Sequence, residues 1–136
     1  ARSAKFLQAF ARIGLIPDAG GSWSLPRLIG PARARGLAML AEPIDAETAE
    51  EWGLIWKAVN DDSLMAEARE TAMKLANGPT LGLALTKQAM LAAATNSLEE
   101  QLLLEEQVQA RAGASDDYRE GVSAFLEKRP VKFSGR

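Results

Sequence analysis

Helix start and stop signals divide the sequence at short intervals from Asp61 to Pro130, and they restrict this half of the chain to helices. Asp62 or Ser63 is a suitable cap for a helix that extends to about Ala76. The Asn77-Gly78-Pro79 triplet then ends that helix and begins the next, which extends to about Ala94.

A capping box marks the following helix. The side chains of Ser97 and Glu100 are spaced so that each accepts the other's backbone N–H, and Gly113 is suited to the far end of the same helix. Ser115 or Asp116 begins the last helix, which must end before Pro130. We therefore expect residues 61–136 to form an all-helical region, with helices as its only regular elements.

The first sixty residues have a mixed pattern. Residues 4–10 and 54–59 are typical of strands, residues 13–21 form a Gly/Pro-containing loop, and residues 22–29 and 31–41 are spaced as two short helices. Asp45 caps a third helix that continues through Glu51 and stops at Gly53. We predict an α/β remnant over residues 1–60 and a separate helical region over residues 61–136.

Composition excludes several kinds of chemistry. The chain has no Cys and no His, which removes disulfides, thiolate sites, metal-binding imidazoles and Ser-His-Asp triads. Basic residues predominate over positions 1–36 but lie among Leu, Ile and Pro rather than among stacking aromatics, so we expect no nucleic-acid partner. The longest uncharged stretches, residues 77–86 and 88–98, are shorter than the roughly 20 residues of a membrane span. We expect a cytoplasmic protein without a membrane partner.

Asp18 is the candidate catalytic residue. It follows Pro17 and precedes Ala19-Gly20-Gly21, where the loop enters a helix. One interpretation is that its carboxylate accepts N–H groups of the following turn, as Asp commonly does at helix starts. The other is that the glycines and the apolar pair Leu15 and Ile16 place a carboxylate at the wall of a pocket, where it could transfer protons.

Several stretches together resemble the crotonase, or enoyl-CoA hydratase/isomerase, superfamily. These are residues 13–21 with Leu25-Pro26-Arg27, residues 46–54 with Val59, Leu85-Thr86-Lys87, and residues 120–129. The resemblance covers essentially the whole chain. It implies the C-terminal part of a crotonase-like ββα spiral, followed by an all-helical oligomerisation region.

Members of that family are about twice this length, and both N–H groups of their oxyanion hole come from segments that would precede Ala1. The hole holds the thioester oxygen of an acyl-CoA as an enolate, on which the family's chemistry depends. We therefore expect the 136-residue chain alone to be inactive.

The position of the acidic residue separates the family's reactions. Hydratases carry a glutamate where this chain has Phe10 and a glycine where it has Asp18, whereas several isomerase branches have a single acid at the latter position. The resemblance therefore implies an acyl-CoA isomerase with Asp18 as proton carrier and Phe10 in the substrate-binding surface. Within the family, the sequence is most similar to the branch that converts a ring epoxide of a phenylacetyl-CoA derivative into an oxepin.

The resemblance also implies that Phe125 and Lys128 contact the coenzyme A bound to a neighbouring subunit. The Phe125 ring would lie against the adenine, and the Lys128 ammonium would lie near a phosphate. The resemblance implies a homo-oligomer, a trimer or hexamer. No metal and no separate cofactor are implied, because coenzyme A is part of the substrate. The tryptophans Trp23, Trp52 and Trp56 are interpreted as core or interface anchors.

Three alternatives remain open. One is an enoyl-CoA hydratase. Another is an enzyme like 4-chlorobenzoyl-CoA dehalogenase, in which an aspartate attacks the ring, although that chemistry requires a His that this chain lacks. The third is a non-catalytic assembly fragment. Along the helix after Ser97, we expect Leu98, Leu102 and Leu103 to form the apolar face and the glutamates to form the solvated face.

Overall fold

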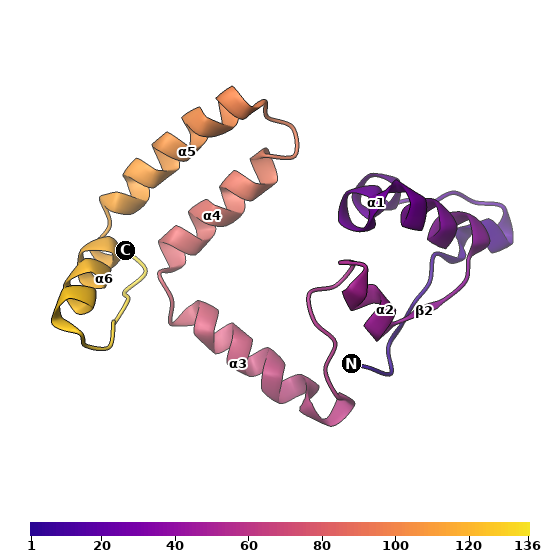
Figure 1. The fold of residues 1–136 in the computed structure, drawn as a ribbon, viewed down its shortest axis with the longest axis horizontal. Coiled ribbons are helices and arrows are strands. Elements are labelled where there is room, and N and C mark those ends of the chain that lie inside the picture. The colour runs from indigo at the N-terminus through magenta and orange to yellow at the C-terminus, as the bar shows by residue number, and fades with distance from the viewer. The chain divides into compact units, whose positions relative to one another are not determined.

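The computed structural model describes all residues from Ala1 to Arg136, and the chain forms two compact units, Ala1–Glu67 and Ala68–Arg136 (Figure 1). The division falls inside helix α3 (Leu64–Ala76), shortly after the change in sequence pattern near Asn60. The functional division of the chain at residue 60 stays a prediction. The two units are described separately below.

The N-terminal unit holds two very short strands and most of its structure is helical. Its elements in chain order are β1 (Lys5–Phe6), the 3-10 helix η1 (Ala9–Ile13), α1 (Gly21–Leu40), β2 (Ile44–Asp45), α2 (Ala46–Glu51) and the 3-10 helix η2 (Asp61–Ser63). The strands pair antiparallel, with Lys5 opposite Asp45 and Phe6 opposite Ile44. The first predicted strand is therefore too long, because Ala9 and Phe10 belong to η1.

The second predicted strand, residues 54–59, is wrong. The backbone N–H groups of Leu54 and Ile55 both donate to the carbonyl of Ala49, at 2.9 and 3.3 Å, and so extend the end of α2 rather than a sheet. Trp56 in this segment is 81% exposed, so it does not belong to the core of this chain, and its alternative role as an interface anchor stays a prediction. An apolar run forms a strand only where a neighbouring strand is available, and here the adjacent carbonyl is helical.

Helix α1 is two helices joined at Gly30, as the sequence predicts. Gly30 has φ 78° and ψ 158°, a backbone conformation that is almost restricted to glycine, and Pro31 begins the second segment. Leu25 and Ile29 from the first segment pack with Ala34 and Leu37 from the second. The break lets both segments contribute to one core.

Trp52 contacts this core together with Ile44 and Leu54, which agrees with its predicted role as an anchor. Trp23 is 52% exposed instead, and the guanidinium of Arg27 lies 3.9 Å from its ring centre. That stacking is a cation–π contact on the surface rather than core packing.

The C-terminal unit contains most of α3, then α4 (Thr80–Ala92), α5 (Leu98–Gly113) and α6 (Asp116–Glu127). The predicted capping box is confirmed: Ser97 N–H donates to Glu100 at 2.7 Å and Glu100 N–H donates to Ser97 Oγ at 3.2 Å. Ser115 caps α6 through the N–H of Tyr118 at 3.0 Å. Helices α4 and α5 pack side by side as a hairpin (Figure 1).

The apolar face predicted for α5 is exposed within this chain. Leu98, Leu102 and Leu103 are 76%, 55% and 55% exposed. The less exposed positions along this helix are instead Gln101, Leu104, Val108 and Ala112, which recur at helical spacing. Periodicity shows that a helix has an apolar face, but it does not show which neighbour covers that face.

The Gly30 break predicts opposite effects for two matched substitutions in α1. Gly30→Ala should destabilise the protein by about 1–3 kcal/mol, because alanine is strained at that backbone conformation. Gly36→Ala should stabilise it by about 0.5–1 kcal/mol, because Gly36 is within the helix. In both cases the added methyl meets no atom within 4 Å, so backbone strain alone distinguishes them. Urea unfolding measures both, and an equal effect of the two substitutions would contradict the assignment.

Candidate functional site

The loop between η1 and α1 carries Asp18 and is held by backbone hydrogen bonds at both ends. Leu15 N–H donates to the Phe10 carbonyl at 3.0 Å, and Gly21 N–H donates to the Asp18 carbonyl at 2.7 Å. Ala19 (φ 48°) and Gly20 (φ 81°) then turn the chain into the helix through left-handed backbone. The loop therefore has a defined path on either side of the acid.

The carboxylate of Asp18 makes no hydrogen bond or ion pair within the chain, and the side chain is exposed. The N-cap of α1 is Gly20, and no side chain caps this helix. The capping interpretation of Asp18 is therefore wrong, because the left-handed turn starts the helix two residues after it. The carboxylate is free to act on a molecule from outside the chain.

An apolar groove adjoins this loop. It is lined along the loop and α1 by Ile16, Pro17, Leu25, Pro26 and Met39, among others. Ile16 was predicted to wall a pocket beside Asp18, and it does line this groove while remaining 80% exposed. Asp18 follows Pro17 directly in the chain and is exposed, but it is not itself among the residues that line the groove.

Phe10 lies in η1 and is half-buried. Arg12 in the same 3-10 helix donates from Nε and Nη2 to the carbonyl of Ala41, at 3.0 and 2.6 Å, which ties η1 to the end of α1. The Phe10 carbonyl accepts the Leu15 hydrogen bond at the start of the loop that carries Asp18, and neither Phe10 nor Asp18 lines the apolar groove. Their roles in a site stay predictions.

Phe125 and Lys128 lie together at the end of α6, in the C-terminal unit. Lys128 N–H donates to the Phe125 carbonyl at 3.3 Å, and Lys128 is the C-cap residue with φ 54°. The Phe125 side chain is 82% exposed, and the Lys128 ammonium has no partner in the chain. An exposed ring and an unpaired cation within one turn are available to an external ligand.

An ion-pair cluster beside this pair was not singled out from the sequence. Arg129 donates from Nη1 and Nη2 to the two carboxylate oxygens of Glu120, at 2.6 and 2.9 Å, and from Nε to Glu127 at 2.7 Å. The Arg129 guanidinium, with the Lys132 N–H, lowers the pKa of Glu120 to about 2. Arg129 and Ser123 lower the pKa of Glu127 as well. Glu120 and Arg129 are nine residues apart and lie on either side of a helix end, so the spacing of three or four residues that indicates an ion pair within a helix does not apply to them.

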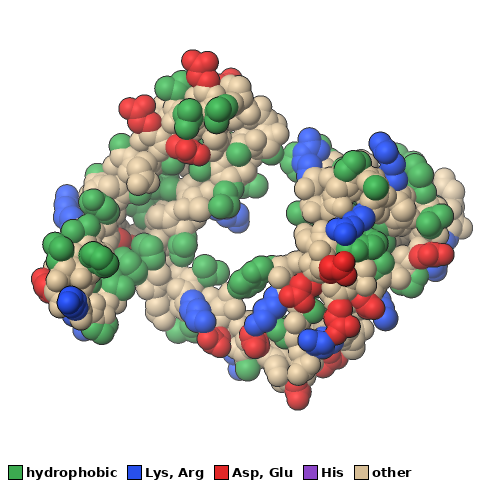
Figure 2. All heavy atoms as spheres, in the orientation of Figure 1, with side chains coloured by type: hydrophobic (Ala, Val, Ile, Leu, Met, Phe, Trp, Pro, Cys, Tyr) green, Lys and Arg blue, Asp and Glu red, His purple; other side chains and the backbone are tan.

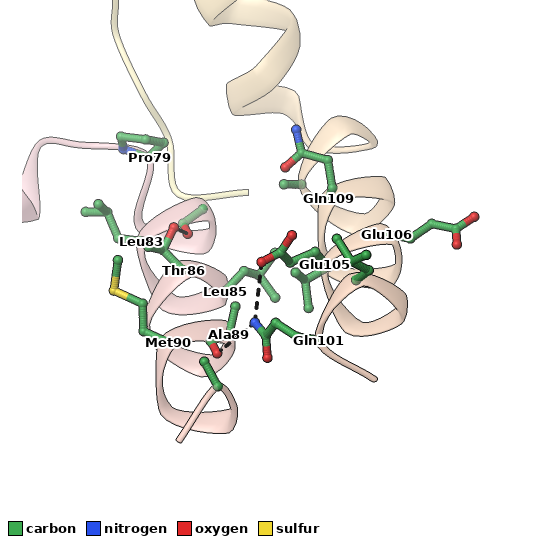
Figure 3. A pocket seen from close by; sticks show the side chains of 15 residues that line it. Pro79, Leu83, Leu85, Thr86, Ala89, Met90, Gln101, Glu105, Glu106 and Gln109 are labelled. Carbon is green, nitrogen blue, oxygen red and sulfur yellow. Dashed lines mark hydrogen bonds between the residues drawn. The ribbon is translucent and has the colours of Figure 1, made fainter. Parts of the chain in front are cut away.

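A hollow between α4 and α5 is lined mostly by apolar side chains, together with Gln101 and Glu105. Gln101 lies between the helices and donates to the Ala89 carbonyl at 3.1 Å and to Glu105 at 3.5 Å (Figure 3). Glu106 points away from α4 in the same view. No three acidic side chains gather in a way that could hold a metal ion.

Charge is unevenly distributed, as the sequence indicates, and Figure 2 shows Lys and Arg side chains over α1. In α1, the guanidinium groups of Arg27 and Arg33 lie over the rings of Trp23 and Trp52, 3.9 and 5.2 Å from the ring centres. No helix combines the length and apolar character that crossing a membrane requires.

A family model described as enoyl-CoA hydratase/isomerase matches residues 1–136, so the chain belongs to this family. Its mostly helical fold with a small sheet corresponds to a C-terminal part of the crotonase fold. A putative enoyl-CoA hydratase/isomerase from Mycobacterium abscessus matches with a TM-score of 0.95 and 41% identity, covering 99% of this chain and 52% of that one.

Two curated relatives match all of this chain. The 1,2-epoxyphenylacetyl-CoA isomerase of Escherichia coli K12 is 56% identical over 136 residues, which are 52% of its length. A probable enoyl-CoA hydratase of Rhodobacter capsulatus is 54% identical over 136 residues, or 53% of its length. The chain thus spans about half the length of these relatives, and the predicted family resemblance is confirmed.

The depressed pKa of Glu120 predicts a titration that can be observed at one amide. Lys132 N–H donates to Glu120 at 2.9 Å, so its NMR shift should follow protonation of that carboxylate. The folded pKa is about 2, below the ordinary 4.5, so this contact stabilises the native state above pH 4.5 and is lost as the pH falls through 2. The titration midpoint seen at the Lys132 amide should be absent in Glu120→Gln. It should persist in Glu106→Gln, because the Glu106 side chain has no partner in the chain. A midpoint near 4.5 would contradict the Arg129 pairing.

Proposed function

We propose that this chain supplies the proton-transferring carboxylate of an acyl-CoA isomerase, with Asp18 as the catalytic residue. The observation that carries the proposal is that the Asp18 carboxylate is exposed and has no partner within the chain, one residue after the Pro17 that lines an apolar groove. The 56% identity to an enzyme named 1,2-epoxyphenylacetyl-CoA isomerase supports the choice of reaction.

In the proposed reaction, an oxyanion hole from residues outside this chain holds the thioester oxygen and makes the adjacent carbon acidic. Asp18 accepts a proton from one carbon and returns it to another, so no atom is gained or lost. For a phenylacetyl-CoA derivative with a ring epoxide, the same pocket would support opening to the seven-membered oxepin. The apolar groove beside Pro17 suits an uncharged acyl group.

Phe125 and Lys128 are proposed to contact the coenzyme A of a neighbouring subunit in a trimer or hexamer. The exposed ring suits stacking on adenine, and the unpaired ammonium suits a phosphate. Exposed Leu98, Leu102 and Leu103 on α5 give the C-terminal unit an apolar surface for contacts between subunits.

Hydration of an enoyl-CoA is the second candidate reaction. It is favoured by the 54% identity to a protein named a probable enoyl-CoA hydratase. Against it stands Phe10, which occupies the position of a hydratase glutamate in the family resemblance and cannot transfer a proton.

Replacing Asp18 with Asn tests the proton carrier. In the complete protein that contains this chain, isomerisation should fall by at least about 10²-fold, because the shape is kept while the base is removed. The KM for the acyl-CoA should change little. Asp62→Asn, an exposed acid in η2, is the matched control and should leave turnover unchanged. Near-normal turnover of Asp18→Asn would refute the assignment.

Replacing Phe10 with Glu tests the choice between isomerase and hydratase. The single substitution should not produce rapid hydration of crotonyl-CoA, because hydratases use a second glutamate and Asp18 would crowd the catalytic water. Steady-state hydration assays on the complete protein measure this. Efficient hydration by Phe10→Glu would place the protein with the hydratases.

A further inference from the structure

The last nine residues double back along α6. The reversal occurs at Lys128, whose φ of 54° and ψ of 37° end the helix, and Arg129 N–H then donates to the Ala124 carbonyl at 3.1 Å. At the other end of the tail, Asp117 N–H donates to the Arg136 carbonyl at 3.0 Å. The C-terminus therefore lies beside the start of α6 (Figure 1).

Ion pairs fasten the tail close to the reversal. Arg129 makes a two-pronged contact with Glu120, and Lys132 N–H adds a third hydrogen bond to the same carboxylate at 2.9 Å. Paired geometry of this kind is more directional than a single charge contact.

A buried carboxylate fastens the far end. Asp117 is 3% exposed and accepts from Ser134 N–H at 2.6 Å and Gly135 N–H at 3.0 Å. Gly135 has φ 80°, and a methyl there would lie 2.5 Å from Thr80 Oγ1, so only glycine fits. The tail is thus docked at both ends.

The docked tail helps to hold the left-handed backbone conformation of Lys128. A non-glycine residue in left-handed backbone costs about 1–2 kcal/mol and persists where its neighbours enforce it. The helix holds Lys128 on one side, and Arg129, the next residue, is held by Glu120 on the other. The direction in which the Lys128 side chain projects from the backbone therefore depends on the docked tail.

We propose that Glu120, Arg129 and Asp117 form a tail clamp that positions Phe125 and Lys128 for coenzyme A. The inference rests on the proposed coenzyme A contact of those two residues. Glu120, Arg129 and Asp117 are positioning residues, because their polar groups are occupied by one another and by the tail. Release of the clamp would let the ammonium sample many positions and would weaken the phosphate contact.

Kinetics on the complete protein with two thioesters test the clamp. One substrate is the acyl-CoA, and the other is the same acyl group on pantetheine, which lacks the adenosine and its phosphates. Glu120→Gln and Arg129→Lys should each raise the KM for the acyl-CoA about fivefold, the equivalent of one exposed charge contact. The KM for the pantetheine thioester and kcat for both substrates should not change. Asp116→Asn, which removes the exposed pair with Arg119 on the same helix, is the matched control.

Lys128→Asn separates failure of the clamp from failure of the proposed contact. Asparagine tolerates left-handed backbone, so this variant removes the charge without adding strain. If Lys128→Asn raises the acyl-CoA KM and the clamp variants do not, the clamp is refuted and the coenzyme A contact stands. If Lys128→Asn leaves the KM unchanged, the contact is refuted, and with it the clamp as its positioning device.

Amide hydrogen exchange supplies a readout that does not depend on activity. The amides of Ser134 and Gly135 should exchange faster in Glu120→Gln and Arg129→Lys than in Asp116→Asn. Unchanged exchange would show that the ion pairs do not hold the tail, which also overturns the proposal. Loss of kcat with both thioesters would indicate general disruption of the fold and would count equally against a positioning role.

Discussion

Left-handed backbone at a few positions determines where the candidate functional side chains of this chain lie. Only three non-glycine residues have positive φ: Ala19, Ala41 and Lys128. Ala19 follows the candidate acid directly, and Lys128 is itself a candidate ligand contact. Each conformation is unfavourable alone, so the surrounding structure must hold it. At Ala41 the support is visible, because its carbonyl accepts two hydrogen bonds from Arg12.

Three aspartates show how local structure either occupies a carboxylate or leaves it available. Asp45 caps α2 through Thr48 N–H at 2.8 Å, and Asp117 holds the C-terminal tail. Asp18 does neither, because left-handed Gly20 begins α1 without a side-chain cap. A helix start that needs no cap gives up some stability and leaves a carboxylate free for chemistry. This is why the same residue type has structural roles at two positions and a proposed catalytic role at the third.

In the C-terminal unit, the carboxylates that hold the tail are different side chains from those that are candidates for binding a ligand. Its carboxylates at Asp117 and Glu120 are directed at its own tail, whereas Phe125 and the Lys128 ammonium face outward without partners. Because the inward groups are satisfied by one another, they do not compete for an external anion. In the proposed contact with coenzyme A, Phe125 and Lys128 would therefore meet the ligand while the backbone beneath them stays in place.

The sequence by itself determined the helix boundaries, because caps and breaks depend on residues within one turn: the Ser97 box and the Gly30-Pro31 break are as predicted. The sequence also indicated Asp18 as a candidate residue. Whether Asp18 caps the following helix or leaves its carboxylate free could be decided only from the backbone angles of the loop. Only the tertiary structure decided that residues 54–59 are not a strand, which face of α5 is less exposed, and that Arg129 pairs with Glu120. Those outcomes depend on which distant segments come together, and local spacing carries no information about that.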